Sequence, residues 1–199
     1  MRILWGMSKT SSAMLALGTV APDFTLPEPA THLNRSLADF AEAEALVVVF
    51  LSNHCPFVKH LADHFSAFAL EYEAKGVAVV GIMSNDVEKY TADAPDRMTE
   101  EVACRGYTFP YLFDESQDIA RAYQAACTPD FFLFDATRRL VYRGQYDGSR
   151  PSLPTPVTGG DLGAAIDAVL AGDGPLNPQI PSVGCNIKWK AGNAPARFG

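Results

Sequence analysis

The chain has 199 residues, 48% of them hydrophobic and 20% charged, so we expect one globular domain with a substantial core and not a disordered chain. Its 16 basic and 23 acidic residues give a formal net charge of −7, and no run of lysine or arginine forms a basic stripe, which argues against nucleic-acid binding. Four cysteines are too few for a disulfide-stapled secreted domain, and their spacing offers no paired zinc ligands.

The two ends of the chain differ in composition from its middle. An apolar start is interrupted at Ser8 before a secretory core could form, and no stretch is long enough to span a membrane. We therefore expect a cytoplasmic protein with no membrane contact. It would consist of an N-terminal extension (residues 1–17), a domain (residues 18–172) and a proline-rich tail (residues 173–199) that packs back on the domain.

The first predicted elements lead into a central strand. Residues 18–27 alternate apolar and polar residues between prolines, a pattern typical of an edge strand at the margin of a sheet, and residues 36–40 resemble a short capped helix. Residues 45–51 form an apolar, β-branched run without polar alternation. Such a run predicts a strand buried on both faces in the middle of a sheet.

A cysteine follows this strand at the start of a helix. Apolar residues recur at gaps of three and four after Cys55, which predicts an amphipathic helix that ends at Gly76. Pro56 suits the first helical position, so Cys55 would be the N-cap or its neighbour, at the positive end of the helix. With His54 beside it, this placement favours the thiolate, although a small buried thiol without reactivity is the alternative.

The remaining elements follow an α/β pattern and then change to a hairpin. Residues 77–83 predict a second buried strand, parallel to the first through a right-handed crossover, with Ser84, Asn85 and Asp86 at the same sheet edge as Cys55. Further elements are expected in chain order: short helices in 87–107, a strand at 109–113, a helix after Ser116, a hairpin over 130–144, and a helix capped by Asp161 and ended by Gly172. The long loop at residues 147–160 needs a packing or functional reason.

This order of elements resembles the thioredoxin fold, an α/β fold with a central mixed sheet flanked by helices. Residues 21–27 are similar to the opening motif of the alkyl hydroperoxide reductase/thiol-specific antioxidant group, and residues 53–59 and 184–190 are similar to a bacterial thioredoxin- or peroxiredoxin-like branch. The resemblance implies that Thr128-Pro129 forms a cis-proline loop facing Cys55. It also implies that Thr128, Pro129 and Pro56 shape the substrate site.

Both active-site patterns of these relatives are incomplete in this chain. Ser52 stands where thioredoxins have the first cysteine of Cys-x-x-Cys; it matches the peroxiredoxin Thr/Ser, but the proline and arginine of that pattern are absent. A second thiol must then come from elsewhere. Because Cys127 precedes the cis-proline loop by a single residue, we predict it as the resolving thiol, with Cys185 in the tail as the alternative and simple packing of Cys127 as a third possibility.

The sequence thus predicts an oxidoreductase that acts on disulfides or peroxides without a metal or organic cofactor. Cys55 is the expected nucleophile, Ser52 or Thr128 would hydrogen-bond its sulfur, and His54 would add positive charge. The partners would be a thiol or disulfide protein, or a peroxide, together with an external thiol reductant. Two alternatives stay open: a one-cysteine thiol peroxidase with antioxidant activity, and a thioredoxin-fold binding module without turnover.

Overall fold

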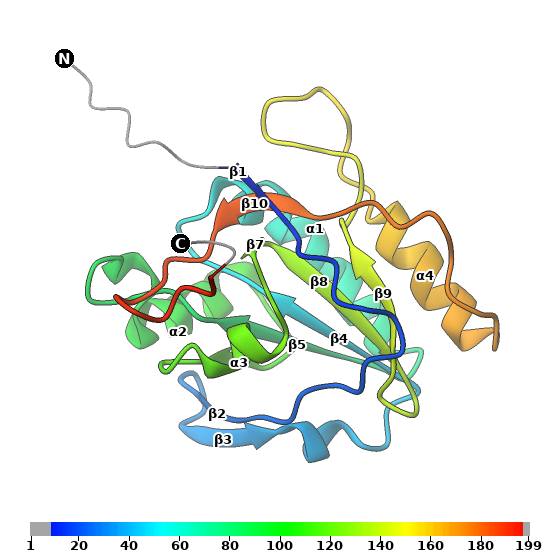
Figure 1. Ribbon diagram of the computed structural model, residues 1–199, viewed down its shortest axis with the longest axis horizontal. Coiled ribbons are helices and arrows are strands. Elements are labelled where there is room, and N and C mark those ends of the chain that lie inside the picture. The colour runs from blue at the N-terminus through cyan, green and yellow to red at the C-terminus, as the bar shows by residue number, and fades with distance from the viewer. Residues whose placement is uncertain (1–8, 197–199) are drawn as a thin grey trace.

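The computed structural model describes residues 9–196 and contains a five-stranded mixed sheet in the order β6-β5-β4-β8-β9 (Figure 1). These strands are β4 (Ala45–Phe50), β5 (Val77–Met83), β6 (Tyr111–Phe113), β8 (Asp130–Asp135) and β9 (Leu140–Gly144). The helices are α1 (Pro56–Glu73), α2 (Pro95–Arg105), α3 (Asp118–Ala122) and α4 (Gly160–Leu170), with short 3₁₀ helices η1 (Leu37–Phe40) and η2 (Thr91–Asp93).

The central strand β4 is buried at every residue, as its apolar sequence predicts. It pairs in parallel with β5, so that Ala45 lies opposite Val77, and antiparallel with β8, so that Phe50 lies opposite Asp130. The parallel pair is joined by α1, and the antiparallel pair β8–β9 forms the predicted hairpin. Cys55 therefore follows the carboxyl end of the central strand β4, which has the parallel strand β5 on one side and the antiparallel strand β8 on the other.

Helices cover both faces of the sheet. Side chains on one face, among them Val47 and Phe131, pack against Phe65 of α1 and Ile166 of α4. On the other face, Val48 and its neighbours pack with Tyr123, which follows α3, and with residues of the N-terminal segment and the tail. These two cores hold β4 and the start of α1 rigidly, which fixes the position of Cys55.

Two small sheets flank the central one. β2 (Thr25–Glu28) and β3 (Leu33–Ser36) form a separate hairpin, so the prediction of one continuous strand over residues 18–27 is wrong. Residues 18–21 do lie along the margin of the main sheet, where Gly18 N donates to the Leu140 carbonyl at 2.7 Å and Val20 bridges to Arg139. The prolines at 22 and 27 limit pairing, because proline offers no backbone donor.

The third sheet joins the two ends of the described chain. β1 (Lys9–Ser11), β10 (Val183–Asn186) and β7 (Cys127–Thr128) lie side by side in the order β1-β10-β7, all antiparallel (Figure 1). β10, in the tail, is therefore hydrogen-bonded to the loop that precedes Pro129. This arrangement positions Cys185 relative to Cys55.

The predicted cap of α4, Asp161, is replaced by other residues. Asp161 lies within the first turn of α4, whose N-cap is Gly159 at φ 64°. Asp147, from the start of the long loop, instead accepts hydrogen bonds from the backbone amides of Thr158 (2.7 Å) and Gly159 (2.8 Å). This carboxylate closes the base of the 147–160 loop and so supplies its packing reason.

Candidate active site

Cys55 is the N-cap of α1, as predicted, and Pro56 occupies the first turn. Its backbone is extended (φ −70°, ψ 121°), and its carbonyl accepts a hydrogen bond from Lys59 N at 2.9 Å. The first backbone N–H groups of a helix lack partners within the helix and carry partial positive charge. The sulfur thus lies where a thiolate is stabilised.

The residues that face the sulfur come from the cis-proline loop. The Thr128–Pro129 peptide bond is cis, and the Cys55 thiol donates a hydrogen bond to the Thr128 carbonyl at 3.0 Å. The Thr128 side chain also stabilises the thiolate, and its hydroxyl has no other hydrogen-bond partner among the described residues. Cys55 itself is 0% exposed.

Of the other three cysteines, Cys185 has the largest influence on the Cys55 thiol. In the β10–β7 pair, Cys185 lies opposite Thr128, whose carbonyl accepts the hydrogen bond from the Cys55 thiol, so the register brings the two cysteines to the same place. Burial alone would raise the Cys55 pKa, but the hydrogen bonds from Cys185, Thr128 and the Val58 amide outweigh it and lower the pKa to about 6. The same contact, together with burial, raises the pKa of Cys185 well above its usual value. Cys55 is therefore the candidate nucleophile, and Cys185 is the thiol that keeps its proton to higher pH.

Cys127, the predicted resolving thiol, points elsewhere. It is fully buried, and its thiol donates to the Pro129 carbonyl at 3.6 Å. Burial, and then the negative charges of Asp130 and Cys55, raise its pKa well above the ordinary thiol value. Cys104 is exposed on α2. The geometry thus favours Cys185 as the partner of Cys55, and a resolving role for Cys127 stays a prediction.

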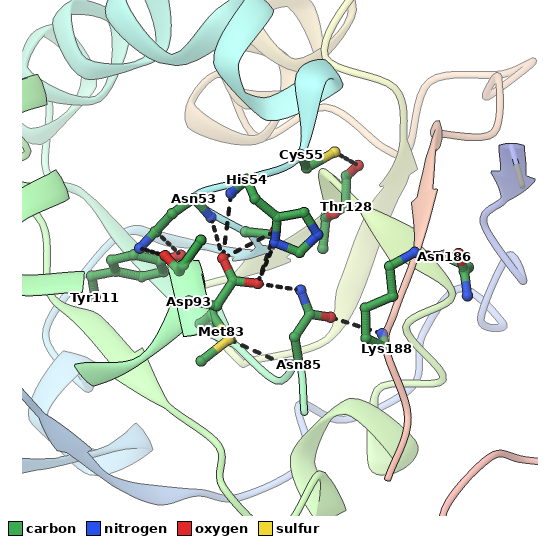
Figure 2. A network of polar contacts seen from close by, with 12 residues as sticks. Asn53, His54, Cys55, Met83, Asn85, Asp93, Tyr111, Thr128, Asn186 and Lys188 are labelled. Carbon is green, nitrogen blue, oxygen red and sulfur yellow. Dashed lines mark hydrogen bonds and ion pairs between the residues drawn. The ribbon is translucent and has the colours of Figure 1, made fainter. Parts of the chain in front are cut away.

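A buried carboxylate holds the turn that precedes Cys55. Asp93, in η2, accepts hydrogen bonds from the Asn53 amide at 2.7 Å and from Asn85 Nδ2 at 2.7 Å, and it pairs with His54 Nδ1 at 2.8 Å (Figure 2). Ser52 Oγ donates to both carboxylate oxygens, at 3.2 and 3.1 Å. Burial opposes ionisation of Asp93, but these hydrogen bonds dominate and lower its pKa.

This network changes the roles expected of Ser52 and His54. The Ser52 hydroxyl is directed to Asp93 and not to the sulfur, so the expectation that it hydrogen-bonds Cys55 is wrong. The His54 ring is stacked on Tyr90, with centroids 5.4 Å apart, and its Nδ1 contacts Asp93. Both side chains position the turn through their contacts with Asp93. In Figure 2 the His54 ring points to Asp93, whereas the Cys55 sulfur points to Thr128.

Sequence reasoning missed Asp93 and undervalued Cys185. Asp93 lies in a polar stretch with no pattern of its own, and only Asn85, placed by the sequence at the same sheet edge, pointed to this region. For Cys185 a signal was present, because the preceding Gly184 allows close backbone contact. A Cβ on Gly184 would lie 2.0 Å from the Thr128 carbonyl oxygen.

We predict that Asp93→Asn lowers the free energy of unfolding by about 2 kcal/mol at pH 7, because hydrogen bonds to a buried charge are lost. The folded-state pKa of Asp93 lies below the ordinary aspartate value of 3.8, so its contribution is present above about pH 4 and is lost as the pH falls further. Urea unfolding at pH 7 and pH 3 measures both effects. Asp96→Asn, at an exposed carboxylate of α2, is the matched control; an equal effect of the two variants at pH 7 would contradict the assigned role.

The surroundings of Cys55 offer little free space for a bound group. The cavity beside Pro129, lined also by Phe57 and His60, has a volume of about 20 Å³, which is enough for a water molecule. Within residues 9–196, no cluster of three or more His, Cys, Asp or Glu side chains could hold a metal ion. In the same residues, no helix is long and apolar enough to cross a membrane.

A cysteine at a helix N-terminus, facing a cis-proline on a mixed sheet, defines a protein of the thioredoxin fold. Solved thiol-disulfide proteins with less than a quarter of identical residues share this fold; one from Chlorobium tepidum has a TM-score of 0.62 at 24% identity, over 78% of this chain and 99% of that chain. A match to the AhpC/TSA family covers residues 17–143. The chain belongs to the AhpC/TSA family.

Relatives with more sequence in common extend this result. A hypothetical protein of Sinorhizobium meliloti 1021 is 51% identical, with a TM-score of 0.90 over 92% of this chain and 100% of that chain. An uncharacterized conserved protein of Geobacillus kaustophilus is 47% identical, with a TM-score of 0.92 over 94% and 98%. The thiol-disulfide oxidoreductase ResA of Geobacillus kaustophilus is 25% identical over 127 residues, 63% of this chain and 67% of that protein. Cys185 lies beyond residues 17–143, which match the family. The first two structures cover 92% and 94% of this chain, so their similarity to it continues past residue 143.

Proposed function

We propose that the protein is a thiol-disulfide oxidoreductase in which Cys55 attacks a partner disulfide and Cys185 resolves the mixed disulfide. The observation that carries this proposal is the β10–β7 register, which places Cys185 opposite Thr128, the residue whose carbonyl accepts the hydrogen bond from the Cys55 thiol. Membership of the AhpC/TSA family and the similarity to ResA support a thiol-dependent redox role. This register gives Cys55 a partner thiol, Cys185, in place of the missing first cysteine of a Cys-x-x-Cys site.

The reaction divides into two exchanges. The Cys55 thiolate attacks one sulfur of the partner disulfide, the partner S–S bond breaks, and one partner thiolate leaves. Cys185 then loses its proton and attacks Cys55 of the mixed disulfide, which forms the Cys55–Cys185 bond and releases the second partner thiol. Two electrons pass to the partner, and an external dithiol reductant returns both cysteines to the thiol form.

One ionised and one protonated thiol suit the order of these two exchange steps. At pH 7 a thiol with a pKa of about 6 is mostly ionised, whereas Cys185 keeps its proton until Cys55 has been consumed and its negative charge removed. All four cysteines are free thiols in the structure. We propose a reducing compartment, the cytoplasm, as the site of action, because four cysteines in 199 residues are too few for a disulfide-stapled secreted domain.

Oxidation followed by disulfide mapping tests this function. After brief treatment with diamide, peptide mass spectrometry is expected to find a Cys55–Cys185 disulfide in the wild type, with the exposed Cys104 outside this disulfide. Cys127→Ser is the matched variant and is expected to form the same disulfide. A Cys55–Cys127 bond would restore Cys127 as resolving thiol, and the absence of any Cys55 disulfide would support a binding module without turnover.

A further inference from the structure

The reactive sulfur is closed off from any partner in this structure. Cys55 is 0% exposed and Cys185 is 4% exposed. The neighbouring cavity of about 20 Å³ is far too small for a polypeptide. Attack on a partner disulfide therefore requires one of the segments that cover Cys55 to move, an argument that rests on the function proposed above.

Three segments cover the sulfur, and they differ in how many side chains each contributes to the main core. The start of α1 and the β7–β8 loop continue directly into helix and sheet residues that are buried in the main core. β10 is short and contributes one side chain, Cys185, to the main core. It pairs with β7 at two positions and with β1 at three. Residues 171–178, earlier in the tail, are exposed, whereas residues 179–182 are tied to the β9 region, for example by Ser182 Oγ, which donates to the Gly144 carbonyl. β10 is therefore the segment that moves at the lowest cost in buried apolar surface.

β10 pairs with the edge of β7 in the way that a strand from another protein could. Its backbone comes so close to Thr128 that residue 184 has no room for a side chain. The next residue, Cys185, thereby lies opposite Thr128, whose carbonyl accepts the hydrogen bond from the Cys55 thiol. An extended peptide that adds to a strand edge gains main-chain hydrogen bonds in the same way, with side chains placed by register. The edge of β7 is thus a strand-binding surface that the chain's own tail occupies.

We propose that β10 is a displaceable internal substrate and that the partner is an extended, disulfide-bearing polypeptide segment that replaces it on the edge of β7. While β10 is bound, it shields Cys55 and competes as a tethered ligand at a high effective concentration. When the partner binds, its cysteine takes the position of Cys185. The return of β10 brings Cys185 back to Cys55, resolves the mixed disulfide and expels the partner.

Gly184→Ala is designed to weaken the seating of β10 without altering a cysteine. The added Cβ would lie 2.0 Å from a backbone oxygen, which only displacement of the strand can relieve. Gly174→Ala, in the exposed segment of the same tail, meets nothing within 4 Å and is the matched control. Circular dichroism and thermal unfolding check that both variants are folded.

Two probes separate access from reactivity. The first is Ellman's reagent, a small aromatic disulfide. The second is a synthetic peptide with the sequence of residues 182–189, its cysteine joined to thionitrobenzoate. Attack by Cys55 on the peptide sulfur breaks that disulfide and releases the yellow thionitrobenzoate anion; attack by Cys185 on Cys55 then frees the peptide thiol. A scrambled peptide of the same composition reports on sequence recognition.

In Gly184→Ala, we expect the rate with the peptide, relative to that with Ellman's reagent, to rise at least tenfold over the wild type. Gly174→Ala should match the wild type, and the scrambled peptide should gain less than threefold. An unchanged ratio in a folded Gly184→Ala protein would overturn the displaceable-strand proposal. Failure of the wild type to form a Cys55–Cys185 bond with either probe would instead overturn the proposed function.

Hydrogen exchange on the wild type gives a second test that needs no variant. The Ile187 amide, which donates to the Ala126 carbonyl at 3.2 Å, should exchange at least a hundredfold faster than amides of β4, because local opening of β10 exposes it. Protection equal to that of β4 would mean that β10 opens only on global unfolding. The proposal would then be wrong whether or not Gly184→Ala folds.

Discussion

Replacing Cys185 with alanine is expected to move the midpoint of the pH dependence of Cys55 alkylation from about 6 to about 8.5, the value of an ordinary thiol. Burial raises the Cys55 pKa, and hydrogen bonds lower it. Among these the one from Cys185 has the largest effect, followed by those from Thr128 and Val58. Iodoacetamide labelling between pH 5 and pH 10, followed by peptide mapping, measures this midpoint. Cys104, which stays exposed, serves as the internal reference.

The change in rate is largest at low pH. At pH 6 the thiolate fraction falls from about one half to roughly 0.3%, while the more basic thiolate becomes roughly tenfold more nucleophilic, so the rate should drop about tenfold. At pH 7 the two effects nearly cancel, which leaves a decrease of about threefold or less. A rate measured at a single neutral pH would therefore hide most of the change, and the full profile is needed.

Two further variants separate the electrostatic role of Cys185 from its redox role. Cys185→Ser keeps a hydrogen-bond donor, so the midpoint should stay below 7, yet the intramolecular disulfide cannot form and a partner peptide should remain trapped on Cys55. Cys127→Ser should change neither property. A midpoint that stays near 6 in Cys185→Ala would contradict the assigned cause of the low pKa.

The turn from β4 into α1 could be predicted because its signals are local. An apolar strand, a proline at the first helical position and a regular apolar spacing all occur within a single stretch of chain, and the structure places Cys55 as N-cap accordingly. The cis-proline loop followed from the family resemblance and is also present. The position of Cys55 at the N-terminus of α1 can thus be predicted largely from neighbouring residues in the sequence.

The partners of that turn could not be predicted in the same way. Asp93 is joined to Asn53 across 40 positions, and Cys185 reaches Cys55 only because β10 crosses β7 far along the chain. Cys127 was favoured because it is close to Pro129 in sequence, but strand geometry directs its sulfur to the Pro129 carbonyl. Proximity along the chain is a weak guide to contacts that depend on which strand edge the tail selects.

A second large effect is expected at Asp130, which follows Pro129. Its carboxyl is fully buried; one oxygen accepts a hydrogen bond from the Ala126 amide at 3.1 Å, whereas Oδ1 has no partner at hydrogen-bonding distance among the described residues. The hydroxyls of Ser12 and Ser182, which flank β1 and β10, face it. Burial dominates and raises the Asp130 pKa from 3.8 to about 7.

Asp130→Asn should therefore gain stability relative to the wild type as the pH rises from 4 to 8. Below the unfolded-state pKa of about 4 the carboxyl is neutral in both states and costs nothing. Between 4 and 7 only the unfolded wild type ionises, so its stability falls, and above 7 the full penalty remains. A shift from 3.8 to about 7 corresponds to about 4 kcal/mol, an upper limit on the relative gain of the uncharged variant.

Urea unfolding of both proteins under reducing conditions, at pH 4, 6 and 8, measures this difference. Subtracting the two curves removes the titration of all other groups, and Cys127, the thiol that faces Asp130, stays protonated throughout because its own pKa is raised. Asp173→Asn, at an exposed position after α4, should show no such trend. A difference between wild type and Asp130→Asn that does not grow with pH would mean that the carboxylate is satisfied when charged. Hydroxyls from the β1 and β10 segments would then have to supply the missing hydrogen bonds, and Asp130 would hold these segments in place instead of weakening them.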